Sequence, residues 1–380
     1  MKKGKMPKIL IVANTDWYLY NFRMDLVLNL IERKWDVILV SPSGPYVARF
    51  QSQGIAWREW QVGRQTIAPW REARSILQLR RIYQQEQPDF IHHHTSKAVI
   101  YGSLAAVFNK TAQVVNSISG RGYVFSNDDL KAFMLRPIVR TMFRIAFKQN
   151  NVNTAIFENP DDHAYFIDAN LLAHKQGHLI QSVGVNLAQF PCTPLPKAKP
   201  IVVMVSRLLW EKGVGLFVEA ARRIKKTTDV RMVLVGMPDI GNPTSIPEST
   251  LEAWVQEGVI EWWKWQEDMK FVYQQCTMVV HPTTYGEGIP TVLLEAGASG
   301  RPVITTDWPG CREAILAGQS GLLVPPKDSE ALTSAITGLL DKPAKCAEMG
   351  LAGRKFVAEH FSIDFINETT ISIYQHILAK

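Results

Sequence analysis

The sequence predicts an α/β protein made of two doubly wound domains. Apolar strand segments alternate with helical segments from residue 8 onward, which is typical of a parallel sheet covered by helices on both faces. The length of 380 residues exceeds the usual size of one domain. A stretch with four prolines in ten residues interrupts the alternation, which then starts again.

The first domain is predicted to span residues 1–183. Its expected strands and helices alternate in the order Lys8–Ala13, Tyr18–Arg33, Asp36–Ser41, Trp70–Gln85, Phe90–His92, Lys97–Phe108, Ala112–Asn116, Leu130–Lys148 and Thr154–Phe157. Residues 184–200, which contain the four prolines, are predicted to be a linker.

The second domain, residues 201–362, repeats the pattern. A strand at Ile201–Ser206 precedes a helix at Gly213–Lys226, and further strands follow at Val230–Val235 and Met278–His281. Residues 363–380 are expected to form a helix that returns to the first domain. Open parallel sheets bind ligands beyond the carboxyl ends of their strands, so two such domains are expected to face a central cleft.

Composition limits the classes of function. Hydrophobic residues make up 46% and charged residues 20%, as in an ordinary globular protein, and the net charge is +7. No nucleic-acid module is recognisable, so a nucleic-acid partner is not expected. The apolar run Ile9–Ala13 is too short for a signal peptide or a membrane span, which predicts a cytoplasmic protein. The four cysteines form no C-x-x-C pair and are expected to be free thiols.

The most specific motif is YGEGIPTVLLEA, residues 285–296, which follows the strand Met278–His281. Pro290 suits the first position of a helix, so Glu287 is expected in the loop and Glu295 within that helix. A carboxylate accepts hydrogen bonds from neighbouring hydroxyls, so two of them eight residues apart suit a ligand with two sugar rings. The alternatives are a carboxylate at a helix start for Glu287 and a solvated helix face for Glu295.

A second motif, SRLLWEKG at residues 206–213, lies between a predicted strand and a helix. It places Arg207 and Lys212 at the carboxyl end of the second sheet, where both could neutralise a diphosphate. Cations fixed near a departing diphosphate stabilise the transition state more than the ground state. The alternative is a solvated basic loop beside Glu211.

Together with TTDWPGCREAI (residues 305–315), these two motifs resemble the retaining GT-B glycosyltransferases of family 4. The resemblance spans nearly the whole chain. Three further runs resemble bacterial enzymes that build surface polysaccharides such as lipopolysaccharide on undecaprenyl diphosphate: VVNSISGRGYVF (114–125), ENPDD (158–162) and SVGVN (182–186).

The resemblance implies roles for the motif residues. Arg207 and Lys212 would hold the donor diphosphate, Glu287 the hydroxyls of the transferred sugar, and Glu295 the ribose. Further contacts with the donor are expected from Ser206, Gly288, Ile289 and Pro290, whose backbone and helix start would supply anion-stabilising dipoles. No metal or other cofactor is expected, and activity should persist in a chelator.

The chain also departs from the family pattern. Ser119 or its neighbours stand where many relatives carry a histidine, and the loop from Asn14 to Trp17 lacks a double glycine. Lys264–Gln266 replaces a glycine-histidine-arginine type of sequence. Contacts with the acceptor and the base are therefore expected to differ from those of relatives.

The first domain offers its own candidates for acceptor or cleft contacts: Asn14, His94, Lys97, Ser119 and Arg121. His94 closes a triplet of histidines at a strand end, where at least one imidazole is expected to point into the cleft and bond a hydroxyl. Adjacent strand residues do not converge on one point, so a metal site is the weaker interpretation and a polar strand end is the other alternative.

The helix predicted at residues 130–148 is basic and amphipathic. Arg136, Arg140, Arg144 and Lys148 recur every four positions, while Phe133, Ile138, Met142, Phe143 and Phe147 supply apolar surface. Such a helix can lie on an anionic bilayer. The alternative is an ordinary helix packed on its own sheet.

The resemblance, with the motifs that carry it, implies a metal-independent retaining hexosyltransferase. It would move a hexose or N-acetylhexosamine from a UDP-sugar to a polyprenyl-diphosphate-linked saccharide at the cytoplasmic leaflet of the inner membrane. Galactose, N-acetylgalactosamine and glucose remain open as the sugar. The alternatives are a nucleotide-sugar 2-epimerase of the same fold and a non-catalytic subunit that binds nucleotide sugars; acceptor-dependent release of UDP would distinguish a transferase from both.

Overall fold

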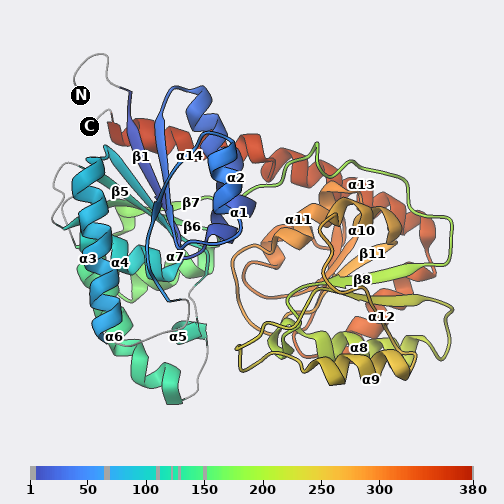
Figure 1. The fold of residues 1–380 in the computed structure, drawn as a ribbon. Coiled ribbons are helices and arrows are strands. Elements are labelled where there is room, and N and C mark those ends of the chain that lie inside the picture. The colour runs from blue at the N-terminus through green and yellow to red at the C-terminus, as the bar shows by residue number, and fades with distance from the viewer. Residues whose placement is uncertain are drawn as a thin grey trace. The chain divides into compact units, whose positions relative to one another are not determined.

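The computed structural model describes residues 6–63, 69–107, 112–120, 123–126, 130–148 and 152–378. The chain divides into two compact units, each built around its own parallel sheet (Figure 1). Unit 1 comprises Met1–Val183 and Asn367–Lys380, and unit 2 comprises Gly184–Ile366.

Unit 1 contains a seven-stranded parallel sheet in the order β3-β2-β1-β4-β5-β6-β7. The strands are β1 (Lys8–Val12), β2 (Asp36–Ser41), β3 (Ala56–Glu59), β4 (Phe90–His94), β5 (Gln113–Ile118), β6 (Val152–Phe157) and β7 (Gly177–Leu179). The strand order reverses direction between β1 and β4, which is where such sheets bind ligands.

The helical elements of unit 1 connect these strands. They are α1 (Asp16–Glu32), α2 (Val47–Ser52), α3 (Pro69–Glu86), α4 (Ser96–Ala106), α5 (Tyr123–Ser126), α6 (Leu130–Phe147), α7 (Pro160–Asp168) and η1 (His174–Gln176). The helices α1 and α7 start on side-chain caps, because Thr15 accepts a hydrogen bond from the Tyr18 amide and Asn159 accepts one from the Asp162 amide.

Unit 2 repeats the design with a six-stranded parallel sheet in the order β10-β9-β8-β11-β12-β13. The strands are β8 (Ile201–Val205), β9 (Arg231–Val235), β10 (Glu261–Trp262), β11 (Met278–His281), β12 (Val303–Thr306) and β13 (Gly321–Val324). Alternate residues of β8 enter two different core clusters, Val202 and Met204 on one face and Val203 and Val205 on the other. Both faces of this sheet are therefore buried, as in a doubly wound fold.

The helical elements of unit 2 are η2 (Trp210–Lys212), α8 (Val214–Ile224), α9 (Glu248–Gln256), α10 (Met269–Gln275), α11 (Thr291–Ala298), η3 (Arg312–Ala314), α12 (Ser329–Leu340) and α13 (Pro343–His360). The last helix, α14 (Ile363–Leu378), begins in unit 2, and its residues from Asn367 onward belong to unit 1.

The predicted alternation is confirmed, but several boundaries differ. β4 runs two residues past the predicted end at His92, because His93 and His94 continue the pairing with β5. Pro290 is the cap of α11 rather than its first residue, with extended backbone at ψ 120°. The short strands β3 and β7 were not predicted, since neither carries an apolar run.

No helix in the described ranges is both long enough and apolar enough to cross a bilayer.

Candidate functional site

The two motif loops of unit 2 meet at the point where the strand order of its sheet reverses. β8 leads into the loop that ends in η2, whose last residue is Lys212, and the neighbouring strand β11 leads into the loop that carries Glu287. The Lys212 ammonium lies 2.5 Å from the Glu287 carboxylate. The sequence therefore brings together, at one sheet edge, two of the three residues predicted to be catalytic.

Local backbone geometry makes this approach possible. Gly213 adopts φ 80°, and a Cβ placed on it would lie 1.9 Å from the carbonyl oxygen of Pro282. Thr284 links the loop after β11 to the loop after β8, because its amide and its hydroxyl both donate to the carbonyl of Glu211 at 2.9 Å. The loops therefore meet in a fixed register, with no room for a side chain at residue 213.

Electrostatics hold both members of the pair in their charged forms. Burial by itself raises the pKa of Glu287, but the Lys212 ammonium and the hydrogen bond from His281 outweigh burial and lower the pKa to about 2. Burial lowers the pKa of Lys212, yet the Glu287 carboxylate raises that pKa above its ordinary value. The site thus presents an ionised carboxylate and a fixed ammonium throughout the neutral range.

Two neighbours of the pair were missed by the sequence reasoning. His281, the last residue of β11, is buried, and its Nε2 donates to Glu287 at 3.1 Å. The ammonium of Lys212 lies 5.1 Å from the centre of the Tyr285 ring. His281 stands six residues before Glu287 at a predicted strand end, and this position was the only signal that could have revealed it.

Cys311 completes a group of possible metal donors with His281 and Glu287, whose ligand atoms all lie within 4.8 Å of one another. The residues fit a cation poorly, because the Lys212 ammonium already contacts the same carboxylate. Burial, followed by the nearby Glu287 charge, raises the pKa of the Cys311 thiol and keeps it protonated.

Glu295 lies on α11, as predicted, and is held by a residue that the sequence reasoning missed. The hydroxyl of Tyr273, on α10, donates to the Glu295 carboxylate at 2.8 Å. Burial raises the pKa of Glu295, and this hydrogen bond only partly opposes the increase. Glu295 is therefore not on a solvated helix face, which was the alternative interpretation.

Arg207 and Ser206 follow β8 but do not join the ion pair of Lys212 and Glu287. The Arg207 guanidinium donates to Asp239 at 2.7 Å and is about half exposed. The Ser206 hydroxyl is buried and has no hydrogen-bond partner within the described part of the chain. Asp239 was not predicted as a site residue. Its carboxylate fixes the Arg207 guanidinium in the loop that follows β8.

Gly288, Ile289 and Pro290 connect Glu287 to the start of α11. Within the described part of the chain no side chain caps this helix, and the amide of Leu293 in its first turn donates to the Pro290 carbonyl at 3.1 Å. A Cβ on Gly310 would lie 2.2 Å from the Glu287 carbonyl oxygen, so this residue must be glycine for the loop to pack as it does.

The histidine triplet of unit 1 does not behave as predicted. His92, His93 and His94 are all buried, because β4 continues through them as a central strand. His92 bonds Tyr374 and Ser117, at 2.5 and 2.7 Å, and His93 bonds Tyr83 and Asn116, at 2.9 and 2.8 Å. The expectation that one imidazole points into a cleft is wrong for these two rings.

His94 is the unpartnered member of the triplet, since within the described ranges neither of its ring nitrogens has a hydrogen-bond partner. Burial, followed by the nearby Arg23 charge, holds its pKa well below the ordinary value. His94 is wholly buried and does not reach solvent.

The other candidates of unit 1 lie at the carboxyl edge of its sheet. Asn14 follows β1 and is half-buried, and Ser119 follows β5 and is exposed. Lys97 donates to the Gly63 carbonyl at 2.7 Å and pairs with Glu72 at 3.3 Å, which gives it a structural role. Arg121 lies outside the described residues.

A buried charged group that was not predicted includes Arg23 of α1 and Glu158, which follows β6. The Arg23 guanidinium donates to the Tyr18 hydroxyl at 2.8 Å. Glu158 follows β6, and burial raises its pKa to about 7, although Arg23 acts in the opposite direction. The ENPDD motif therefore carries a carboxyl group that titrates near neutrality.

Three basic residues of α6 make hydrogen bonds to other parts of unit 1. Arg136 donates to the Val124 carbonyl at 3.1 Å, Arg140 to the Tyr165 hydroxyl at 3.3 Å, and Arg144 to the Ala169 carbonyl at 3.3 Å. Arg144 is nevertheless exposed, as is Lys148, which follows the last residue of the helix. The predicted apolar face is divided, because Phe143 and Phe147 belong to the core. The large apolar side chains left exposed in the first half of the helix are those of Leu130, Phe133, Met134 and Ile138.

Comparison with known proteins identifies the family. The model described as "Glycosyl transferase 4-like" matches residues 8–154, and the model "Glycosyl transferases group 1" matches residues 188–356. The chain is 28% identical, over 85% of its length and 86% of the relative's, to the N,N'-diacetylbacillosaminyl-diphospho-undecaprenol alpha-1,3-N-acetylgalactosaminyltransferase of Campylobacter jejuni. It is 24% identical, over 92% of both chains, to the capsular polysaccharide biosynthesis glycosyltransferase CapM of Staphylococcus aureus.

Among solved structures, Anabaena HepE in complex with UDP-glucose superposes with a TM-score of 0.75 at 18% identity, over 97% of this chain and 99% of that one. The first of these family models matches the part of the chain that forms most of the sheet of unit 1, and the second matches the part that forms the sheet of unit 2. The two-sheet fold is consistent with both matches. The chain therefore belongs to the family 4 glycosyltransferases and has the GT-B fold.

Proposed function

We propose that this glycosyltransferase moves a hexose or N-acetylhexosamine, with retention of configuration, from a UDP-sugar to a lipid-diphosphate-linked saccharide in the synthesis of bacterial surface polysaccharide. The observation that carries the proposal is the ion pair between the buried Lys212 and the half-buried Glu287 at the reversal point of the second sheet. The names of the Campylobacter and Staphylococcus relatives support the acceptor and the process. The UDP-glucose complex of HepE supports the donor.

Glu287 is suited to orient the donor sugar. Its carboxylate stays ionised because its pKa is about 2, and it has lone pairs left after it has accepted from Lys212 and His281. Those lone pairs can accept hydrogen bonds from two sugar hydroxyls. The same negative charge opposes the positive charge that develops on the sugar ring in the transition state.

Lys212 is suited to stabilise the leaving group. As the bond between the anomeric carbon and the phosphate oxygen breaks, negative charge accumulates on the diphosphate, and a preorganised ammonium lowers the energy of that state. Arg207 and the uncapped start of α11 would add to this stabilisation. Because the residues at the site fit a cation poorly, we propose that these groups serve in place of a divalent metal ion.

The transfer is proposed to occur on one face of the sugar. The acceptor oxygen forms a bond to the anomeric carbon on the face from which UDP departs, and the acceptor proton passes to the leaving phosphate oxygen. This route needs no protein nucleophile. Glu295, held by Tyr273, is proposed to accept hydrogen bonds from the ribose hydroxyls.

The proposal is tested by measuring UDP release from a panel of UDP-sugars, with and without undecaprenyl-diphosphate-linked saccharides, in the presence of a chelator. We expect release that requires both a matching donor and an acceptor, and an α-linked product. Release without any acceptor would indicate hydrolysis or epimerisation instead. Activity that appears only after a divalent ion is added would contradict the metal-independent mechanism.

Membrane association is proposed to depend on the exposed apolar row of α6, defined as Leu130, Phe133, Met134 and Ile138. The row lies on the same helix as the exposed Arg144, and the exposed Lys148 follows the end of that helix. Basic residues near an anionic surface contribute about 1 kcal/mol each, and a buried phenylalanine contributes about 2 kcal/mol. We therefore place the enzyme at the cytoplasmic leaflet of the inner membrane.

The variant Phe133→Ser/Met134→Ser is expected to lower sedimentation with phosphatidylglycerol vesicles by about tenfold or more. Phe271→Ser is the matched control, because it removes an exposed phenylalanine from unit 2. Equal sedimentation of all three proteins, or none by the parent protein, would refute membrane docking through α6.

A further inference from the structure

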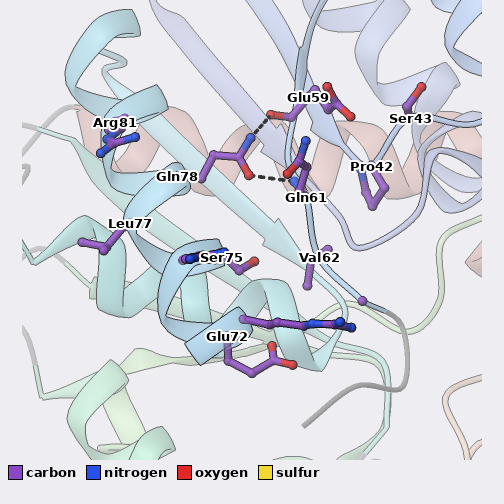
Figure 2. Close-up of a pocket in the computed structure, with 13 residues that line it drawn as sticks. Pro42, Ser43, Glu59, Gln61, Val62, Glu72, Ser75, Leu77, Gln78 and Arg81 are labelled. Atoms are coloured by element: carbon purple, nitrogen blue, oxygen red, sulfur yellow. Dashed lines mark hydrogen bonds between the residues drawn. The ribbon is translucent and has the colours of Figure 1, made fainter. Parts of the chain in front are cut away.

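A cavity of about 870 Å³ lies in unit 1, between α3 and the segments that follow β2 and β3 (Figure 2). We propose that this cavity is a binding site for an anionic saccharide, in which Arg71, Arg74 and Arg81 hold phosphate or carboxylate groups. The proposal concerns unit 1 alone, so it does not depend on the donor or the lipid acceptor proposed above.

The three arginines form the charged side of the cavity. All three are exposed residues of α3, with Arg71 and Arg74 one helical turn apart and Arg81 two turns farther along. Within the described part of the chain, none of these guanidinium groups has an ion pair or a hydrogen bond. Several exposed arginines elsewhere do have carboxylate partners; Arg222, for example, makes two hydrogen bonds to Glu257.

The acidic residues of the cavity do not neutralise this charge. Glu72 is paired with Lys97, which also holds the Gly63 carbonyl at the cavity wall. Glu59 is the other carboxylate of the lining. The remaining excess of positive charge suits a ligand with more than one negative group, because guanidinium groups bind carboxylates and phosphates in a two-pronged geometry.

The walls of the cavity are held in place before any ligand arrives. Gln78 donates to the Glu59 carbonyl at 3.0 Å and accepts from the Gln61 amide at 2.8 Å, as the dashed lines in Figure 2 show. The Trp60 indole donates to the Ser75 carbonyl at 3.1 Å. A ligand therefore binds without the entropic cost of ordering the strand edge against the helix.

Ser75 provides a second, independent sign of a ligand. It lines the cavity and is 2% exposed, yet its hydroxyl has no hydrogen-bond partner among the described residues. A buried hydroxyl without a partner is unfavourable, and an oxygen of a bound saccharide would satisfy it. The side chains of Ser43 and Gln61 also line the cavity and could bond further hydroxyl groups.

The volume favours a saccharide over a single small anion. Sites for small organic ligands occupy about 300–1,000 Å³, and this cavity lies near the upper limit. The combination of guanidinium, amide and hydroxyl groups matches sugars that carry phosphate or uronic acid groups. A neutral saccharide would leave the three arginines without partners.

Titration calorimetry at about 0.1 M salt tests the proposal with three probes: inorganic diphosphate for phosphate, a disaccharide of two uronic acids for carboxylate, and maltose as the neutral control. We expect at least one anionic probe, and not maltose, to bind the parent protein. Arg71→Gln/Arg74→Gln should weaken that binding by about tenfold or more. The probe that binds identifies which anionic group the cavity prefers.

The matched control is Arg80→Gln, which removes a positive charge from the same helix but lies outside the cavity lining. It should change the affinity by less than about twofold. Ser75→Ala should weaken binding severalfold without lowering the melting temperature, since the hydroxyl has no partner in the ligand-free protein. Equal affinity of the parent and Arg71→Gln/Arg74→Gln for both anionic probes, or no binding by the parent at about 10 mM, would overturn the proposal.

Discussion

Replacing Lys212 by methionine is expected to lower kcat/KM for sugar transfer by about 10² to 10³-fold, because one fixed charge at a developing anion contributes that much. The ammonium lies 2.5 Å from Glu287 and is buried, so no solvent cation can take its place. The loss should appear mainly in kcat, since the ammonium acts on the charge that forms as UDP departs. Initial rates of UDP release over a range of donor concentrations measure this effect.

The same substitution leaves the Glu287 carboxylate with His281 as its main partner, at a cost of about 3–5 kcal/mol for an uncompensated buried charge. The double variant Lys212→Met/Glu287→Gln removes both charges and should recover most of this stability without recovering activity. Thermal unfolding followed beside the activity separates the two effects. Recovery of activity in the double variant would show that Lys212 acts only by supporting the fold.

A pH profile provides an independent check on this prediction. In the parent protein the pKa of Glu287 is about 2, so its ionisation produces no loss of activity above about pH 4. In Lys212→Met the carboxylate loses its principal partner and burial raises its pKa, so residual activity should fall as the pH drops through that higher value. Lys226→Met, a change of an exposed lysine in the same unit, should leave both the rate and the profile unchanged.

The sequence predicted which loops form the candidate site better than it predicted the contacts between their side chains. Strand and helix periodicity locates the carboxyl ends of β8 and β11, and motif spacing places Lys212 and Glu287 in the two loops that follow. It gave no indication that Asp239 would hold Arg207, because these residues lie 32 positions apart in different loops. Partners of this kind depend on how the loops fold over the sheet edge, which local patterns do not encode.

The histidine triplet shows the same limit in unit 1. Three consecutive polar residues indicate a strand end when only local sequence is considered. In the structure, Tyr374, which is 282 residues away from His92, makes burial of that ring favourable. Polar residues can continue a central strand where distant side chains satisfy them, and a single sequence does not reveal such partners.

The substitution Gly213→Ala is expected to destabilise the protein by several kcal/mol and to lower kcat by about 10²-fold. At φ 80° an alanine is strained, and its Cβ would lie 1.9 Å from the Pro282 carbonyl oxygen. Relief of that clash requires η2 to move away from the end of β11. Because Lys212 precedes the glycine and His281 precedes the proline, both sides of the candidate site would shift. Thermal unfolding and transfer assays on the same samples measure the two effects.

The control variant Gly258→Ala separates the effect of backbone strain from the effect of the clash between a Cβ at residue 213 and the Pro282 carbonyl. Gly258 adopts φ 75°, nearly the same conformation, but a Cβ placed on it would have no atom within 4 Å. This control should cost about 1–2 kcal/mol from strain alone and leave kcat unchanged. If the two variants lose equal stability and both retain activity, then the close packing of the loops at Gly213 does not position Lys212. If only Gly213→Ala loses activity, the glycine is required because it allows the two motif loops to meet at the reversal point of the sheet.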